Sequence, residues 1–534
     1  MREGCVADRL WWQDGVIYQI YPRSFMDSNG DGVGDLAGIR QRLEHLVWLG
    51  IDAIWLSPCF PSPMADFGYD VADYCDIDPL FGTLDEFDSL IAEAHRVEIR
   101  VILDWVPNHS SDQHAWFLES RLGRDSPKRD WYVWRDGKSD GSPPNNWMSI
   151  FGGGAWTWDD TTEQFYLHTF LAQQPELNWR NPQLVAAMHD VLRFWLDRGV
   201  DGFRIDVIHA IAKDPALRDN PVIPDVRPGY FGQRHLHDQN HPDVHPMLRS
   251  IRSVLDEYDE RMAVGEVSLF DPQEVSRYYG DDDELHLAFN FSFLRSAWSA
   301  SAFGGEIDRF EAALPAGCWP DLVLSNHDSS RHATRYDDEQ LGEARARVAA
   351  VLLLASRGTP FLYYGEEIGM RDVPIPADRL MDPVARNIHP KVGRDPERTP
   401  MQWDGSEAAG FSTGAPWLPI AADAGARNVE AQRENPASLL HLYRDLLRLR
   451  RSTPALQRGE YRRLDTPEPV LAFERSTEGS RALIALNFGG DAVSIELGAG
   501  SVAAGIRTAY GEPIPSRAGL IHLEPSEALV LVLA

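Results

Sequence analysis

Residues 184–207, LVAAMHDVLRFWLDRGVDGFRIDV, contain the structural unit that decides the fold. Apolar residues recur at helical spacing through the first part, and Gly199 stands where a helix C-terminal glycine is expected. The run that follows, DGFRIDV, is short and mostly apolar, which is typical of a buried strand. The segment therefore predicts a helix that leads directly into a strand of a covered sheet.

The same strand pattern recurs eight times along the chain. The runs are VIYQIYP (16–22), DAIWLSP (52–58), RVILDWVP (100–107), DGFRIDV (201–207), MAVGEV (262–267), HLAFNF (286–291), DLVLSN (321–326) and TPFLYYGEE (359–367). Helix-period segments such as 39–50 and 87–98 lie between them. Eight such repeats predict an α/β fold in the form of a closed (β/α)8 TIM barrel rather than an open sheet.

The spacing of the runs indicates two additions to this barrel. The third and fourth runs are twice as far apart as the second and third, and residues 108–178 between them are rich in Trp, Gly, Pro and Asn. They predict a small inserted domain. Short alternating strands over 459–534 predict a C-terminal β-sandwich, an antiparallel β domain. Residues 1–107 and 179–458 would form the barrel.

Composition limits the partners of this 534-residue chain. Lys and Arg number 51 against 81 Asp and Glu, a formal net charge of −30, and a field of that sign repels nucleic acids and anionic membranes. The sequence shows no signal peptide or membrane span, and its four Cys, Cys5 among them, have no metal or disulfide spacing. We expect a cytoplasmic monomer or small homo-oligomer that acts on a small molecule.

Acidic residues stand at the carboxyl ends of four predicted strands, where barrel interiors are normally apolar. They are Asp104, Asp206, Glu266 and Asp328. In a (β/α)8 barrel these strand ends form the rim on which active sites are built. One acid there would be interpreted as a helix cap or an ion-pair partner, but four on one rim favour a catalytic site.

Neighbouring residues suggest what these acids do. Arg204 and Asp206 lie two apart on one strand, so they face the same side, and the arginine would hold Asp206 ionised as a nucleophile. Glu266 would then be the proton donor, with His109 and His327 as hydrogen-bond donors. Such a set fits retaining glycoside hydrolysis, although spacing alone does not show that the residues converge.

Four ordered segments resemble the signatures of glycoside hydrolase family 13, the α-amylase superfamily. They are DWVPNH (104–109), GFRIDVIH (202–209), GEV (265–267) and SNHD (325–328). Three further segments resemble its α-glucosidase and oligo-1,6-glucosidase branch, namely QIYPRSF (19–25), DFGYDVADY (66–74) and ERTPMQWD (397–404). The likeness extends from about residue 11 to residue 404.

The resemblance implies an activity and its catalytic residues. Asp206 would be the nucleophile, Glu266 the acid and base, and Asp328 the residue that holds two hydroxyls of the reacting glucose. The enzyme would be an exo-acting retaining α-glucosidase that releases α-glucose from the non-reducing end of maltose- or isomaltose-type oligosaccharides. At high acceptor concentration it would also transfer glucose. Catalysis would need no cofactor.

The resemblance also implies a set of sugar-binding residues: Asp66, Tyr69, His109, Phe151, Phe170, Arg204, Val207, His327 and Arg398. Tyr69 would stack beneath the ring, while Asp66 and Arg398 would together grip the non-reducing end. Val207, directly after the nucleophile, resembles a position at which Val accompanies a preference for α-1,6 bonds.

Two alternatives stay open at this point. Trehalose synthases and sucrose isomerases resemble the same motifs and differ in how well they exclude water, which the sequence does not show. Catalytically inactive barrels that serve as interaction subunits share the fold, but they lose the acids that this chain keeps. Ser329 and Ser330 depart from the residues usual after the fourth segment, so the leaving-group site is not predicted in detail.

The loop DSNGDGVGD (27–35) has the alternating oxygen spacing of a calcium loop. The donors would be the side chains of Asp27, Asn29, Asp31 and Asp35 and the carbonyl of Val33. Gly38 replaces the bidentate Glu of an EF-hand, and a turn without an ion is the alternative. Because relatives in the resembling branch bind Ca²⁺ here, we expect a structural Ca²⁺, with Mg²⁺ as the other possibility.

Overall fold

The computed structural model describes residues 10–389, 392–509 and 513–534, so Cys5 and the start of the chain lie outside the described residues. Cys59, Cys75 and Cys318 are free thiols. Within the described ranges, no helix combines the length and the apolar character that crossing a bilayer requires.

Eight parallel strands form the central sheet, in the order β10-β11-β1-β2-β3-β7-β8-β9. They are β1 (Ile17–Ile20), β2 (Ala53–Leu56), β3 (Arg100–Trp105), β7 (Gly202–Ile205), β8 (Met262–Gly265), β9 (Leu287–Ala288), β10 (Asp321–Val323) and β11 (Thr359–Tyr363). At the seam between β9 and β10, the amide of Asn290 donates to the Asp321 carboxylate at 3.2 Å. The sheet is therefore a nearly closed barrel, which confirms the predicted fold class.

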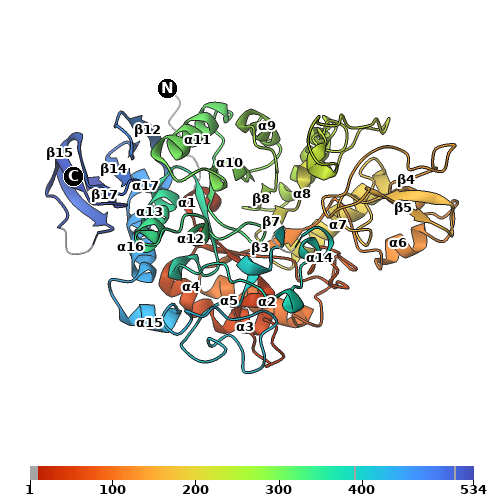
Figure 1. Cartoon of the computed structure of the whole chain (residues 1–534), viewed down its shortest axis with the longest axis horizontal. Helices are drawn as coiled ribbons and strands as arrows, with labels where there is room; N and C mark the ends of the chain where they lie inside the picture. The colour runs from red at the N-terminus through yellow and green to blue at the C-terminus, as the bar shows by residue number, and fades with distance from the viewer. Residues whose placement is uncertain (1–9, 390–391, 510–512) are drawn as a thin grey trace.

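Helices surround this barrel, as Figure 1 shows. The longest are α5 (Leu84–Arg96), α7 (Pro182–Asp197), α8 (Val244–Leu255), α11 (Ala300–Ala313), α13 (Gly342–Ala355) and α16 (Leu439–Ser452). Helix α7 starts at Asn181, whose side chain accepts from two amides of the first turn, and Gly199 after it has a φ of 99°. Helix α13 is apolar because it is buried between α16 and the C-terminal sheet.

The insertion after β3 contains a small antiparallel sheet. Its strands are β4 (Trp134–Arg135), β5 (Trp156–Asp159) and β6 (Gln164–Leu167), in the order β4-β6-β5. Aromatic side chains, among them Trp147, Trp156 and Phe165, form a core of its own on this sheet. In Figure 1 the insertion lies at one end of the molecule and the C-terminal sheet at the other.

The C-terminal strands form one continuous antiparallel sheet, in the order β12-β13-β14-β17-β15-β16. They are β12 (Glu460–Leu464), β13 (Val470–Thr477), β14 (Ser480–Asn487), β15 (Val493–Arg507), β16 (Arg517–Leu523) and β17 (Ala528–Leu533). The register of β15 against β16 shifts between Glu496 and Gly500. Side chains of β13, β14 and β17 share one core with those of β15 and β16. The predicted antiparallel β domain is therefore present, and its six strands belong to one hydrogen-bonded sheet and not to two separate sheets.

Candidate active site

Arg204 on β7 is the centre of the acidic cluster on the barrel rim. It donates to Asp104 at 2.9 Å, to Asp206 at 2.7 Å and to Glu266 at 2.5 Å, and its side chain is 3% exposed. The barrel brings these acids together because Asp104 on β3 is the ladder partner of Arg204, and Glu266 follows the neighbouring strand β8. The structure therefore brings Asp104, Asp206 and Glu266 together, which their spacing in the sequence could not show.

Opposing effects act on the carboxyl group of Asp206. Burial raises the pKa of Asp206 well above its usual range, and the nearby Glu266 and Asp104 raise it further, although Arg204 acts in the opposite direction. Burial likewise raises the pKa of Asp104 to about 6 against the effect of Arg204. Burial and the neighbouring acids therefore oppose the ionised form of Asp206 and Arg204 favours it, so the expectation that Arg204 keeps Asp206 ionised stays a prediction.

Asp206 and Glu266 lie close together. Both contact the same guanidinium, Asp206 at 2.7 Å and Glu266 at 2.5 Å, and Glu266 is one of the groups that raise the pKa of Asp206. Inverting glycosidases separate their two carboxyl groups to admit a water molecule, whereas retaining enzymes keep them close. The geometry therefore fits a nucleophile beside an acid and base.

Val207 connects the nucleophile to the acid through its backbone. Its φ of 32° and ψ of 42° are left-handed, which is unusual for a β-branched residue. The Val207 amide donates to Glu266 Oε2 at 3.1 Å, and Ser268 donates to Glu266 Oε1 at 3.3 Å. The strained turn after Asp206 thus holds the carboxylate of Glu266 in place.

Asp328 lies in a cationic environment. Arg398 donates to its carboxylate at 2.7 Å and Arg394 at 3.1 Å, and His327 Nε2 lies 3.1 Å away. Burial would raise the pKa of Asp328, but His327 and the two arginines outweigh it and hold that pKa well below its usual range. Asp328 is therefore a fixed anion, suited to accept hydrogen bonds from sugar hydroxyls.

Arg394 is a site residue that the sequence analysis missed. Asp66 forms its ion pair with Arg394, at 2.7 Å, and not with Arg398, which instead contacts Asp328 and the carbonyl of His327. Arg394 also contacts Asp382 at 2.8 Å and lies 5.2 Å from the centre of the Phe151 ring. The prediction that Asp66 and Arg398 together grip the non-reducing end of the sugar stays a prediction, and Arg394 joins them in the same network.

The remaining predicted residues surround the same acids. Tyr69 stacks on His327 with ring centres 5.4 Å apart, and its hydroxyl donates to Asp104 at 3.2 Å. Phe170 lies 4.9 Å from His109 and 5.6 Å from Phe151, measured between ring centres. Aromatic rings therefore line this side of the site.

Gln174, in the insertion, was not predicted. Its side-chain nitrogen lies 3.2 Å from Asp66 Oδ2 and 3.2 Å from His109 Nε2. Burial lowers the pKa of His109 to about 3, so this imidazole is neutral. A lone glutamine outside any motif carries no sequence signal for such a role.

The loop 27–35 forms a turn in which side-chain oxygens accept backbone hydrogen bonds. Asp27 accepts from the amides of Asn29, Gly30 and Gly32, Asn29 accepts from Asp31, and Asp31 accepts from Val33. Asp35 caps α3 (Leu36–Gln41). In the described ranges no three His, Cys, Asp or Glu side chains are grouped to hold a metal. Two of the donors predicted for this loop are of other kinds, namely the amide oxygen of Asn29 and the carbonyl oxygen of Val33. The calcium site stays a prediction.

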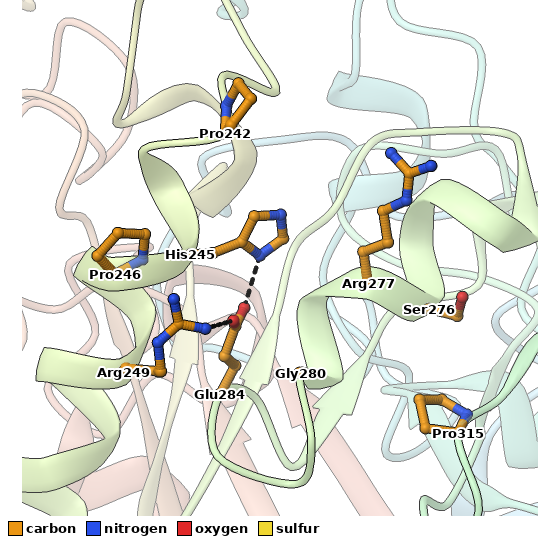
Figure 2. A pocket seen from close by; sticks show the side chains of 9 residues that line it. All are labelled: Pro242, His245, Pro246, Arg249, Ser276, Arg277, Gly280, Glu284 and Pro315. Carbon is orange, nitrogen blue, oxygen red and sulfur yellow. Dashed lines mark hydrogen bonds and ion pairs between the residues drawn. The ribbon is translucent and has the colours of Figure 1, made fainter.

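A separate surface pocket of about 650 Å³ lies beside α8. In Figure 2, His245 and Arg249 both point to Glu284, at 2.8 Å and 2.6 Å. Prolines and the exposed Arg277 complete its walls, and none of the acids bound to Arg204 lines it. The candidate active site is therefore the rim cluster and not this pocket.

A barrel whose strand ends bring several buried carboxylates together around one arginine is the arrangement on which glycoside hydrolases are built. The family model "Alpha amylase, catalytic domain" matches residues 19–459. The chain belongs to the α-amylase family, glycoside hydrolase family 13, and is an enzyme of its α-glucosidase group.

Relatives agree with this assignment over their whole length. The chain is 46% identical over 509 residues to a "Probable alpha-glucosidase" of Rhizobium meliloti (strain 1021), covering 92% of this chain and 91% of the relative. It is 40% identical to the "Oligo-1,6-glucosidase" of Heyndrickxia coagulans, with 91% and 93% covered. Both names are those of glucosidases, which agrees with an enzyme of this family and not with the inactive-barrel alternative.

Solved structures share the whole fold. An "alpha-glucosyl transfer enzyme" superposes with a TM-score of 0.93 at 43% identity, covering 99% of this chain and 100% of that one. The trehalulose synthase of Pseudomonas mesoacidophila MX-45 superposes with a TM-score of 0.89 at 35% identity, with 98% and 99% covered. The same architecture therefore serves hydrolysis, glucosyl transfer and sucrose isomerisation.

Proposed function

We propose that this enzyme is an exo-acting retaining α-glucosidase that releases α-glucose from the non-reducing end of short maltose- or isomaltose-type oligosaccharides. The observation that carries the proposal is the network in which Arg394 joins Asp66 to Asp328. The side chains of Asp66 and Arg394 are 4% and 14% exposed. Buried, paired charges at this end of the site would stop a sugar chain from continuing past it, which favours attack on a terminal glucose over attack on an internal bond.

The residues around Arg204 supply both halves of the reaction. Glu266 protonates the glycosidic oxygen while Asp206 attacks C1 and forms a covalent glucosyl ester. Asp328 accepts hydrogen bonds from the sugar as the ring flattens, which stabilises the transition state more than the ground state. Glu266 then takes a proton from water, which releases glucose from Asp206.

Glucosyl transfer is the second candidate, favoured by the similarity to the glucosyl-transfer enzyme and the trehalulose synthase. Both functions use the same covalent intermediate and differ in whether water or a sugar receives the glucose. Chromatography of the products from maltose, isomaltose, sucrose and trehalose separates them. Free glucose from maltose or isomaltose supports the proposal, whereas isomerised disaccharides as the main product would replace it.

The stereochemistry of the product gives a direct test. Attack by Asp206 and then by water inverts C1 twice, so α-glucose should appear first in ¹H NMR spectra and only later mutarotate. Initial release of β-glucose would exclude Asp206 as a nucleophile. A retained α-configuration should be accompanied by transfer products when acceptor sugar is added in excess.

Linkage preference is expected to depend on Val207. Its side chain is 8% exposed in the turn that follows the nucleophile, so it restricts the space next to Asp206. We expect a higher kcat/KM on isomaltose than on maltose, and Val207→Thr should move the ratio toward maltose by about ten-fold, the lower end of what such pocket changes achieve. Parallel kinetics on both disaccharides measure this. If the ratio does not change, Ser329 and Ser330 are the next positions to vary.

We also propose a structural Ca²⁺ in the loop 27–35, whose donors would all be oxygens, the ligand type that Ca²⁺ selects. An ion bound only by the folded state stabilises it by mass action. EDTA should therefore lower Tm while kcat at a permissive temperature changes little, and Asp27→Ala should remove the effect of added Ca²⁺. The same Tm with EDTA and with Ca²⁺ would indicate that the turn forms without a metal.

A further inference from the structure

The two carboxylate oxygens of Glu266 have different partners. Oε2 accepts from the guanidinium of Arg204 at 2.5 Å and from the amide of Val207 at 3.1 Å. Both partners are N–H groups that can only donate. A proton on Oε2 would displace one of these two hydrogen bonds, so Oε2 is the oxygen that stays unprotonated.

Oε1 meets a different kind of group. The hydroxyl of Ser268 lies 3.3 Å from Oε1, and a hydroxyl can donate to a carboxylate or accept from a carboxylic acid. Ser268 is therefore compatible with both protonation states of Glu266 at this oxygen. An N–H group in the same position could only donate, so it would be compatible with the ionised carboxylate alone.

The backbone fixes Ser268 relative to Glu266. The amide of Ser268 lies 3.4 Å from Nδ1 of His209, and the carbonyl of Glu266 lies 3.2 Å from the same nitrogen. His209 is buried on the segment that follows β7. The backbone of the turn 266–268 is thus attached to the segment that follows Asp206, which sets where the side chains of Glu266 and Ser268 start.

We propose that Oε1 is the oxygen of Glu266 that gives and takes the catalytic proton, and that Ser268 is the positioning residue that orients it; this rests on the proposed function. In the first step the Oε1–H bond breaks, the proton moves to the glycosidic oxygen, and the C1–oxygen bond breaks as an Asp206 oxygen bonds to C1. In the second step the oxygen of water bonds to C1, its proton returns to Oε1, and the Asp206 ester is released.

The positioning role predicts a dependence on the leaving group. A sugar alcohol leaves only when its oxygen is protonated, whereas p-nitrophenolate leaves without a proton. The ratio kcat/KM reports the first step alone, so it isolates proton donation from the later use of Glu266 as a base. Loss of Ser268 should therefore affect isomaltose and spare p-nitrophenyl α-glucoside.

The experiment compares three variants on these two substrates. We expect Ser268→Ala to lower kcat/KM on isomaltose about ten-fold, part of the 10²–10⁴-fold that general acid catalysis supplies, and to change p-nitrophenyl α-glucoside less than about two-fold. Ser268→Thr keeps the hydroxyl and should restore isomaltose activity. Ser292→Ala is the matched control, since its hydroxyl donates to the carbonyl of Phe270 and not to Glu266.

Each result has a distinct meaning. An equal loss of kcat/KM on both substrates would show that Ser268 acts on folding or sugar binding, and no loss on isomaltose would show that Glu266 needs no orientation; either overturns the proposal. Both outcomes leave the wild-type activity and the proposed function unaffected. A wild-type enzyme that releases no glucose from either substrate would instead refute the proposed function.

Discussion

Asp206→Ala and Glu266→Gln are each expected to reduce kcat on isomaltose by about 10⁴-fold or more, because one removes the nucleophile and the other the proton donor. Both side chains project from the rim of the barrel and not into its apolar interior. The fold should therefore persist in both variants. Far-UV circular dichroism and Tm, measured beside the kinetics, test this separation of activity from stability.

Asp206→Asn should even stabilise the folded protein. Because burial and neighbouring acids raise the pKa of Asp206, ionising it costs folding free energy. A buried acid with a raised pKa destabilises the folded state as pH rises from the unfolded pKa of about 4 toward the higher folded pKa. The Tm advantage of Asp206→Asn over wild type should thus grow from pH 4 to pH 7.

Glu496→Gln provides the control, as this residue is exposed on β15 of the C-terminal sheet. It should change neither kcat nor the pH dependence of Tm. Near-normal turnover by Asp206→Ala or Glu266→Gln would exclude the assigned mechanism. A constant Tm difference between Asp206→Asn and wild type across this pH range would contradict a raised pKa of Asp206.

Arg394→Met is expected to have the next largest effect. Arg394 neutralises Asp66, Asp382 and Asp328 together, at 2.7, 2.8 and 3.1 Å. Burial already raises the pKa of Asp66 to about 6 although Arg394 lowers it, so Asp66 should become protonated at neutral pH once the arginine is removed. Truncating one partner of a buried charge pair costs roughly 3 kcal/mol, about two orders of magnitude in kcat/KM.

Arg394→Lys should give an intermediate kcat/KM, because a lysine keeps the charge but cannot contact several carboxylates with a planar fork. Arg386→Met is the matched control: Arg386 lies in the nearby helix α14 (Pro383–Asn387), is exposed, and donates to the carbonyl of Leu380. Kinetics on maltose and isomaltose measure the three variants. Equal kcat/KM in Arg394→Met and Arg386→Met would show that Arg394 does not close the pocket.

The candidate site could be predicted only in part, and its two arginines show why. Arg394 precedes one short helical turn and Arg398 is its last residue, and the motif that marks the branch contains Arg398 alone. In the fold, Arg398 reaches Asp328, while Arg394 reaches Asp66 on a loop far away in the sequence. Sequence motifs identify which segment contributes, but side-chain direction in an irregular loop depends on what packs around it.

The sequence by itself determined the barrel, the insertion and the C-terminal strands, because hydrophobic periodicity and strand–helix alternation are local properties. It also placed Asp104, Asp206, Glu266 and Asp328 at strand ends. Only the tertiary structure decided that Asp104, Asp206 and Glu266 share Arg204, that burial raises the pKa of Asp206, and that Val207 is held in a left-handed turn. Charge states and strain depend on burial and on neighbours from other strands, which a linear pattern does not contain.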